Sequence, residues 1–351
     1  MIKAKQLIFF ILIFLVTYLI FVYPFDVLYY FAFQGNIFGF SSLYFTIIFY
    51  LAVIFFFKSH NTFFLLKLFV HEGMGVGFIS FWVVNLGLLA ENFVTVPSAT
   101  LALICVLTII IITVFSLING RLINLKSIKI SSVKAKENVR LLFISDTHLG
   151  SNSKKHLESI YSKIKDINFD LLLIGGDFID SSSFNLNGLD VLRKIKKPIL
   201  FISGNHEYYI HGIEEKFKRL GDFNLIFLDN QSYKLKNFNF IGISDNQTVQ
   251  EQKLVAETFI EEDFFNLILV HKPSLWDHIY KKSDLMLSGH THDGQIYPFN
   301  LLVKLQFKYI YGLYEKLTSK LYVSSGSGCW GPKMRLGTKN EIVYILISND
   351  H

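Results

Sequence analysis

Apolar residues form two different patterns along the chain. In the first third they gather into long runs that contain few charged residues. These runs cover residues 6–23, 37–57, 69–89 and 99–117. A helix needs about 20 apolar residues to cross the hydrocarbon core of a bilayer. We therefore predict a transmembrane region of about four helices over residues 1–120. The first run is an anchor rather than a secretory signal, because no small-residue cleavage site follows Tyr23.

The rest of the chain alternates short apolar runs with helix-like stretches. The apolar runs, which are typical of buried strands, cover residues 141–144, 171–174, 199–202, 267–270 and 285–287. The helix-like stretches cover residues 154–165, 189–196, 214–220 and 249–260. Such alternation indicates an α/β fold. We expect this domain over residues 139–351. The basic stretch 121–138 before it is either a juxtamembrane linker or an edge strand.

The glycines and the few ionisable residues of the apolar runs indicate packing between helices rather than a catalytic or transport site. His71 and Glu72 begin a zinc-protease pattern, but Gly75 stands where the second histidine would be. Gly73 and Gly77 are spaced as small residues that let helices approach closely. No row of ionisable residues passes through the four runs, so a transport pathway has little support.

Composition and charge also distinguish the apolar first third of the chain from the rest. Hydrophobic residues make up 51% of the 351 residues and the mean hydropathy is +0.39, which is too apolar for an ordinary soluble protein. Lys58 and Lys67 lie between the second and third apolar runs, whereas segments 24–36 and 90–98 contain no Lys or Arg. Basic flanks favour the cytoplasmic side. Four spans would therefore place the C-terminal domain in the cytoplasm, and three or five spans would reverse it.

Metal-binding side chains follow each of the five strand-like runs. In chain order these residues are Asp146, His148, Asp177, Asp180, Asn205, His206, His271, His290 and His292. Strand ends in an α/β sheet bring several loops to one edge. Carboxylate and amide oxygens suit hard divalent cations, and imidazole adds affinity for manganese, iron or zinc. Asp177 alone, after two glycines, would be an ordinary turn residue. Five coincident strand ends predict a binuclear metal site instead.

These blocks resemble the calcineurin-like metallophosphoesterase superfamily. Its ordered motifs correspond to Asp146-x-His148, Gly176-Asp177-x-x-Asp180, Gly204-Asn205-His206-Glu207, His271 and Gly289-His290-x-His292. The glycine-rich tail at residues 321–337 looks like the membrane-anchored bacterial branch of that superfamily. The resemblance covers residues 139–348 and implies a two-sheet sandwich flanked by helices.

The resemblance also implies a ligand set for two divalent metal ions, manganese first and iron or zinc as alternatives. One ion would take Asp146, His148, Asp177 and His292, and the other would take Asp177, Asn205, His271 and His290. Asp177 would bridge the two ions, and a water between them would be the nucleophile. His206 would act on the leaving oxygen as the catalytic acid, and Asp180 would orient a neighbouring ligand.

Two features of this chain bear on the substrate. Asp293 stands where the family branch usually has glycine. Aspartate tolerates left-handed backbone, so we expect the turn to form, with a carboxylate that disfavours highly charged phosphomonoesters. Residues 296–320 are rich in apolar and aromatic side chains. They either guide an acyl chain or form a hairpin that completes the core.

These observations together predict a membrane-anchored phosphohydrolase. We expect it to cleave a phosphodiester or pyrophosphate bond of a lipid-linked substrate, such as a UDP-diacylglucosamine-type lipid A precursor or a phospholipid. Its partners would be the lipid bilayer of a bacterial inner membrane and that substrate, and we expect no nucleic acid. The alternatives are a phosphodiesterase for soluble substrates, with the helices only as a tether, and a non-catalytic membrane sensor or scaffold.

Overall fold

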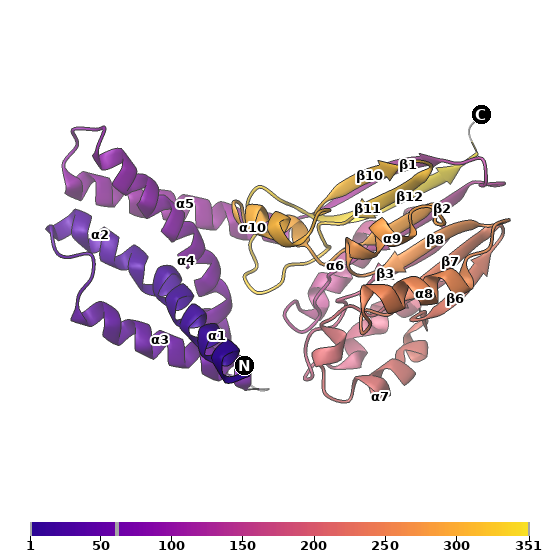
Figure 1. Cartoon of the computed structure of the whole chain (residues 1–351), viewed down its shortest axis with the longest axis horizontal. Coiled ribbons are helices and arrows are strands. Elements are labelled where there is room, and N and C mark those ends of the chain that lie inside the picture. Colours follow the sequence, from indigo (N-terminus) through magenta and orange to yellow (C-terminus); the bar gives the residue numbers. More distant parts are fainter. Residues whose placement is uncertain (1, 60–62, 350–351) are drawn as a thin grey trace. The chain divides into compact units, whose positions relative to one another are not determined.

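The computed structural model describes residues 2–59 and 63–349 of the chain. These residues form two compact units, one helical and one built mainly from β-sheet (Figure 1). The first unit is Met1–Ile118 with Gly331–Met334, and the second is Asn119–Trp330 with Arg335–His351.

The first unit consists of apolar helices. They are α1 (Ile2–Thr17), the π-helical turn η1 (Tyr18–Val22), α2 (Tyr23–Phe33), α3 (Phe40–Lys58), α4 (Phe64–Glu91) and α5 (Ser98–Arg121). Because α1, η1 and α2 run on as one stretch, the described residues contain four segments long and apolar enough to cross a membrane. This number agrees with the four apolar runs of the sequence.

The first of these segments is longer than the sequence pattern indicates. We expected a loop from residue 24 onward, but the helix continues through Pro24 to Phe33. Pro24 lies in the first turn of α2, where its missing N–H leaves no helical hydrogen bond unmade. The wider π-helical turn directly before it gives room for the proline ring.

Glycines allow close packing between α4 and the π-helical turn. A Cβ atom on Gly77 would collide with the carbonyl oxygen of Ile20, and one on Gly73 would lie 2.9 Å from the ring of Phe21. The helix packing expected for these two glycines is therefore confirmed.

The second unit contains two six-stranded sheets. The first has the order β1-β12-β2-β3-β4-β5 and the second β10-β11-β9-β8-β7-β6. The strands are β1 (Ile123–Ser131), β2 (Val139–Ile144), β3 (Leu171–Gly175), β4 (Ile199–Ile202), β5 (Leu225–Phe227), β6 (Gln231–Leu235), β7 (Phe238–Ile243), β8 (Phe265–Val270), β9 (Leu285–Ser288), β10 (Gly312–Lys316), β11 (Ser319–Val323) and β12 (Asn340–Ser348). β2, β3 and β4 are parallel, and so are β8 and β9. Within each sheet, the loops that carry the predicted site residues therefore leave the same edge.

The central strands β2, β3, β4, β8 and β9 are apolar on both faces, because both faces of each sheet are covered. In β2, Leu141 and Phe143 pack in the core between the two sheets, whereas Leu142 and Ile144 pack outward. The outer face of the first sheet is covered by α6 (Lys154–Ile164) and the 3₁₀ helix η2 (Leu186–Lys194). The second sheet is covered by α8 (Val249–Phe259) and α9 (Trp276–Ile279). This arrangement is the predicted α/β two-sheet sandwich flanked by helices.

Three segments adopt a form that the sequence left open or that we predicted differently. The basic stretch 121–138 contains β1, an edge strand that pairs in parallel with β12. The helix expected at 189–196 is instead the 3₁₀ helix η2 at Leu186–Lys194. Residues 296–320 contain the short helix α10 (Phe299–Gln306) before the β10–β11 hairpin begins.

Candidate metal centre

The loops that follow β2, β3 and β9 place the predicted site residues in unusual backbone conformations. Positive φ angles occur at Asp146 (53°), His148 (50°), Asp177 (49°), His290 (71°) and His292 (50°). Residues other than glycine occupy this region at a cost of about 1–3 kcal/mol each, and they do so mainly at functional sites. The tertiary structure therefore holds these residues in backbone conformations that they would rarely adopt in an isolated peptide.

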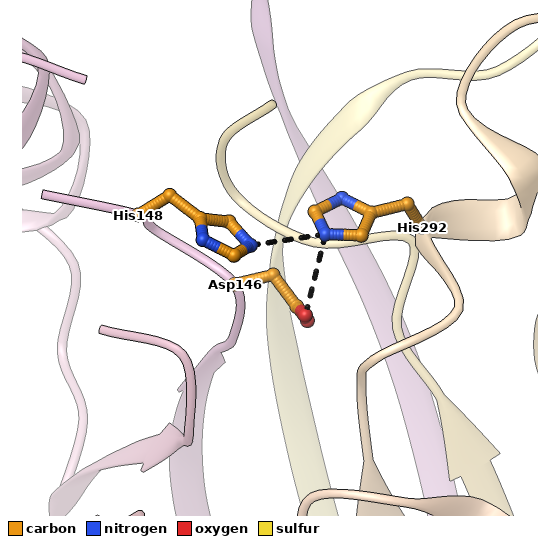
Figure 2. Close-up of side chains that lie close together, drawn as sticks. All are labelled: Asp146, His148 and His292. Atoms are coloured by element: carbon orange, nitrogen blue, oxygen red, sulfur yellow. Dashed lines mark hydrogen bonds and ion pairs between the residues drawn. The ribbon is translucent and has the colours of Figure 1, made fainter. Parts of the chain in front are cut away.

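The first cluster joins the two sheets. Asp146 and His148 come from the β2 loop and His292 from the β9 loop, and their side chains point toward one another (Figure 2). The Nε2 atoms of His148 and His292 are 3.1 Å apart, and His292 Nε2 is 3.5 Å from Asp146 Oδ1. All three residues are buried. Three donor atoms thus converge on one point.

The second cluster contains Asp177, His271 and His290. His271 Nε2 is 3.1 Å from Asp177 Oδ2 and 3.2 Å from His290 Nδ1. The same Asp177 oxygen is 3.9 Å from Nε2 of His148, which belongs to the first cluster. The Asp177 carboxylate therefore lies between the clusters, where a carboxylate shared by two cations would have to be.

The donor set suits divalent cations. Asn205 Oδ1 is buried and has no hydrogen-bond partner among the described residues, so an acceptor oxygen remains available at the end of β4. Burial opposes protonation of His271, but the adjacent Asp177 carboxylate outweighs it and raises the pKa of His271 to about 10. The centre needs positive charge, which divalent cations supply to oxygen and nitrogen donors.

His290 and His292 are held neutral. Burial and the neighbouring His271 lower the pKa of His290 to about 2. Burial also holds the pKa of His292 well below its usual value. A neutral imidazole presents the lone pair that metal binding requires. Burial raises the pKa of Asp146, as expected for a carboxylate whose charge lacks a full partner.

One hydrogen bond and one contact with a carboxylate orient imidazoles toward the centre. His271 donates from Nδ1 to the carbonyl of Gly175 at 2.9 Å, which leaves Nε2 facing Asp177. Nδ1 of His148 lies 3.4 Å from Oδ2 of Asp180, on the side of the ring opposite the cluster. Such contacts fix the tautomer and ring direction of metal-binding histidines. Asp180 thus lies behind a proposed ligand.

His206 lies at the rim of the centre. Its Nε2 is 3.9 Å from Asp177 Oδ2, its ring packs edge-on against Trp330 at 5.7 Å, and its side chain is 18% exposed. Burial lowers the pKa of His206 to about 4, so the imidazole is neutral at pH 7. His206 is close enough to His148 and Asp177 to join them around an ion, so geometry alone permits both a catalytic role and a ligand role.

Two buried residues that support the centre, Glu207 and Arg335, were not assigned a role from the sequence. The Glu207 carboxylate accepts hydrogen bonds from the backbone N–H groups of Asp177 (3.0 Å), Phe178, Ile179 and Gly204 (2.8 Å). It therefore ties the β3 loop to the β4 loop. Its place beside His206 in the sequence was visible, but three of its four backbone partners were not, because they lie 28–30 residues away.

Arg335 is the second of these residues, and it is fully buried. Its guanidinium donates to the carbonyl oxygens of His292 (2.7 Å), Ser325 (2.6 Å) and Gly328 (2.7 Å), and to Oδ1 of Asn340 (2.8 Å). A buried cation is stable only when its donors are satisfied in this way. Arg335 thereby holds the loop that carries His292 against the C-terminal segment.

Known proteins resemble this chain over about three fifths of its length. Residues 139–294 match the sequence profile of the calcineurin-like phosphoesterases. An uncharacterized metallophosphoesterase of Helicobacter pylori is 34% identical over 61% of this chain and 61% of its own length. YkoQ of Bacillus subtilis, also an uncharacterized metallophosphoesterase, is 30% identical over 60% of this chain and 84% of its own length. A transmembrane protein with metallophosphoesterase domain from Danio rerio is 29% identical over 60% of this chain and 53% of its own length.

The matched region carries the whole candidate centre, from Asp146 to His292. The chain spans about three fifths of the Helicobacter pylori relative. Four apolar helices and the transmembrane relative indicate membrane association. From its ordered motifs, its two-sheet sandwich and these relatives, the chain belongs to the calcineurin-like metallophosphoesterase family.

Proposed function

We propose that this chain is a membrane-anchored phosphohydrolase that uses two divalent metal ions to cleave a phosphodiester or pyrophosphate bond of a lipid-linked substrate. The observation that carries this proposal is the position of the Asp177 carboxylate, within 3.1 Å of a nitrogen of one cluster and 3.9 Å of a nitrogen of the other. Manganese is our first choice for both ions, with iron or zinc as alternatives.

The clusters define which residues would hold the ions. Asp146, His148, Asp177 and His292 would hold the first, and Asp177, Asn205, His271 and His290 the second. When bound, such ions neutralise the negative charge of a phosphate and promote ionisation of a water. Asn205 contributes a neutral oxygen, which limits the negative charge that a phosphate has to approach.

The chain's own residues supply orientation and proton control. Asp180 and the carbonyl of Gly175 hold His148 and His271 with Nε2 toward the centre. His206, at the partly open rim, would donate an N–H to the leaving oxygen and stabilise its charge. Its edge-on contact with Trp330 keeps the ring in place.

Asp293 favours a substrate with little charge at phosphorus. It adopts φ 53° and ψ 28°, so the left-handed turn expected for this aspartate is present. Burial raises the pKa of Asp293 to about 6, which still leaves a carboxylate at pH 7. A phosphodiester or pyrophosphate linkage carries one charge on each phosphorus, whereas a phosphomonoester dianion would be repelled more strongly. This supports a diester or pyrophosphate as the bond that is cleaved.

Membrane association supports a substrate with acyl chains. Four helices suited to the bilayer occupy the first third of the chain, and the segment after the metal-binding β9 loop exposes several large apolar side chains. A UDP-diacylglucosamine-type lipid A precursor and a phospholipid both combine acyl chains with a phosphate linkage. We place the chain in the bacterial inner membrane, with the second unit on the cytoplasmic side.

Hydrolysis by the purified full-length protein tests the enzyme activity. We expect bis-p-nitrophenyl phosphate to be cleaved with Mn²⁺, cleavage to stop after chelation, and activity to return when Mn²⁺ is added back. Asp177→Ala should abolish cleavage because both clusters lose the shared carboxylate. Asp166→Ala, at an exposed aspartate, is the matched control. Equal rates for Asp177→Ala and the unchanged protein would show that the domain is not a metallohydrolase of this design.

Lipid extracts test the substrate class. Extracts incubated with the protein and analysed by mass spectrometry should lose a lipid with a phosphodiester or pyrophosphate linkage, and the Asp177→Ala protein should leave it intact. Rapid cleavage of small diesters without any change in the lipids would favour the alternative in which the helices are only a tether. Metal binding without any hydrolysis would favour the sensor alternative.

A further inference from the structure

The helix α10 differs from α6 and α8 because it buries none of its apolar side chains. α6 buries Leu157, Ile160 and Ile164, and α8 buries Gln252 and Ala256. α10 has the sequence FNLLVKLQ, yet none of its eight residues is buried. Amphipathic helices of globular domains normally turn the apolar side toward the core. The apolar side of α10 is therefore turned away from the domain.

Three leucines form this exposed side. Leu301 is 53% exposed, Leu302 is 56% exposed and Leu305 is 84% exposed. With 3.6 residues per turn, these positions lie within an arc of about 100° on one side of the helix. Large apolar side chains gathered in this way mark a surface that contacts another apolar phase. We call these three residues the leucine face.

Basic residues lie next to the leucine face. Lys304 lies one residue from Leu305, and Lys308 follows shortly after the end of the helix. Both are exposed, and the whole chain has a net charge of +6. Helices that lie in the headgroup region of a bilayer combine an apolar side with Lys or Arg at its border, because the lysines attract anionic headgroups.

α10 also packs against the loop that carries His290 and His292 of the candidate metal centre. A Cβ atom on Gly294, two residues after His292, would collide with the backbone of Asn300 in the first turn of α10. The ring of Phe307, at the end of the helix, lies 5.1 Å from the ring of His290. The leucine face is thus presented by a helix that packs directly on the loop of two proposed metal ligands.

We propose that the leucine face of α10 inserts into the headgroup and acyl boundary of the bilayer that the chain's own helices span. The occupant is lipid, because the side chains are apolar, their border is basic, and the same chain carries four segments suited to a membrane. The inference rests on the membrane anchoring in the proposed function and deepens it. It places lipid next to the metal centre, where a lipid-linked phosphate has to arrive.

Site-directed spin labelling tests the insertion directly. The full-length protein, reconstituted into vesicles of phosphatidylethanolamine and phosphatidylglycerol, is labelled at Leu305→Cys. Leu254→Cys is the matched control, because this leucine lies on α8 and is also exposed (64%). Cys105 and Cys329 are buried, and an unsubstituted protein carried through labelling measures their background. We expect the Leu305 label to collide more with oxygen and less with a water-soluble nickel chelate than the Leu254 label.

Each other outcome overturns the inference. Equal access of nickel to both labels means that α10 stays in water. Shielding of the Leu305 label from oxygen as well as nickel means that protein covers the leucine face. A lipid-like profile at both labels means that the contact does not belong to α10. Because the readout needs no hydrolysis, an inserted helix in an inactive protein would refute the proposed activity and leave this inference intact.

Discussion

Side-chain identity and backbone conformation contribute separately to the candidate centre. The sequence placed the donor residues after five strands, but it gave no sign that Asp146, His148, Asp177, His290 and His292 adopt positive φ angles. Aspartate and histidine adopt this conformation more often than most residues, but they still do so uncommonly. The surrounding fold offsets the free-energy cost of these positive φ angles, in part through the backbone hydrogen bonds to Glu207 and Arg335. Residues that hold these loops are thus as necessary to the centre as the donors.

His206 provides the sharpest test of roles at the residue scale. We expect His206→Ala to reduce the turnover of bis-p-nitrophenyl phosphate by about 10²–10⁴-fold, the usual contribution of a positioned acid or base. Two metal ions per chain should remain, measured by elemental analysis. His278→Ala, at an exposed histidine of α9, is the control. Loss of one ion together with activity would instead make His206 a ligand, which its distance to Asp177 permits.

Glu207 is expected to act through the loops that it joins. Glu207→Gln replaces one acceptor oxygen by an N–H donor that faces backbone donors, so the β3 and β4 loops should loosen. We expect the affinity for Mn²⁺ to fall by about 10–100-fold, as for other groups behind metal ligands. Isothermal titration calorimetry measures the change.

Glu251→Gln is the matched control for that measurement. Glu251 also accepts a backbone hydrogen bond, from Thr248 at 2.7 Å, but it lies at the start of α8 and is exposed. Unchanged affinity for the Glu207 variant would mean that its four backbone bonds do not position the ligands.

At the scale of elements, each of the five predicted runs lies within two residues of a strand of the structure. Both faces of these strands are covered, so they are continuously apolar and easy to recognise in the sequence. The run expected at 285–287, for example, is β9 at Leu285–Ser288. The form of residues 296–320 could not be predicted, because apolar side chains in a short segment fit a helix and a strand equally well. Both occur there, as α10 and as the β10–β11 hairpin.

An ion-pair group joins α9 to β10 and gives a pH-dependent contribution to stability. The Asp277 carboxylate pairs with Lys316, accepts a hydrogen bond from Tyr309 Oη at 2.7 Å, and lies 3.3 Å from Lys308. Burial opposes ionisation, but these partners outweigh it and hold the pKa of Asp277 below its usual value. The folded carboxyl therefore has a lower pKa than the unfolded one. Its stabilisation is present above the unfolded pKa of about 3.9 and is lost as pH falls through the folded value.

Asp277→Asn should lower the melting temperature of the metal-free protein at pH 7, and the deficit should shrink as the pH falls below about 3.9. The loss should stay below about 1 kcal/mol, because the side chain is partly exposed and solvent screens the pairs. Thermal unfolding in detergent with a chelator present measures the deficit at pH 7 and at pH 3. Asp222→Asn, at an exposed pair with Arg219, is the control. A deficit of the same size at pH 3 would contradict an ionic origin.

At the scale of the whole molecule, the number of membrane crossings decides which side of the bilayer carries the metal centre. The described residues contain four candidate spans. The segments before the first span and between the second and third carry Lys residues, whereas residues 90–98 carry none. Because basic flanks favour the cytoplasmic side, we predict that both ends of the region lie there.

Reporter fusions test this orientation. Green fluorescent protein fused after residue 351 should fluoresce in bacterial cells, and alkaline phosphatase at the same point should be inactive. The same reporters fused after residue 93, between the third and fourth spans, should give the opposite pattern and serve as the control. Active phosphatase after residue 351 would place the second unit outside the cytoplasm and refute our topology.

Local periodicity was enough to determine the apolar spans, five buried strands and the kinds of donor at their ends, since these depend on residues that are neighbours in the chain. Only the tertiary structure decided that Asp177 lies between two clusters, that Glu207 binds the β3 loop, and that α10 turns its leucines outward. Each of these depends on distances between segments separated by several to more than a hundred residues. Such distances arise when the two sheets pack against each other, and no short window of sequence contains them.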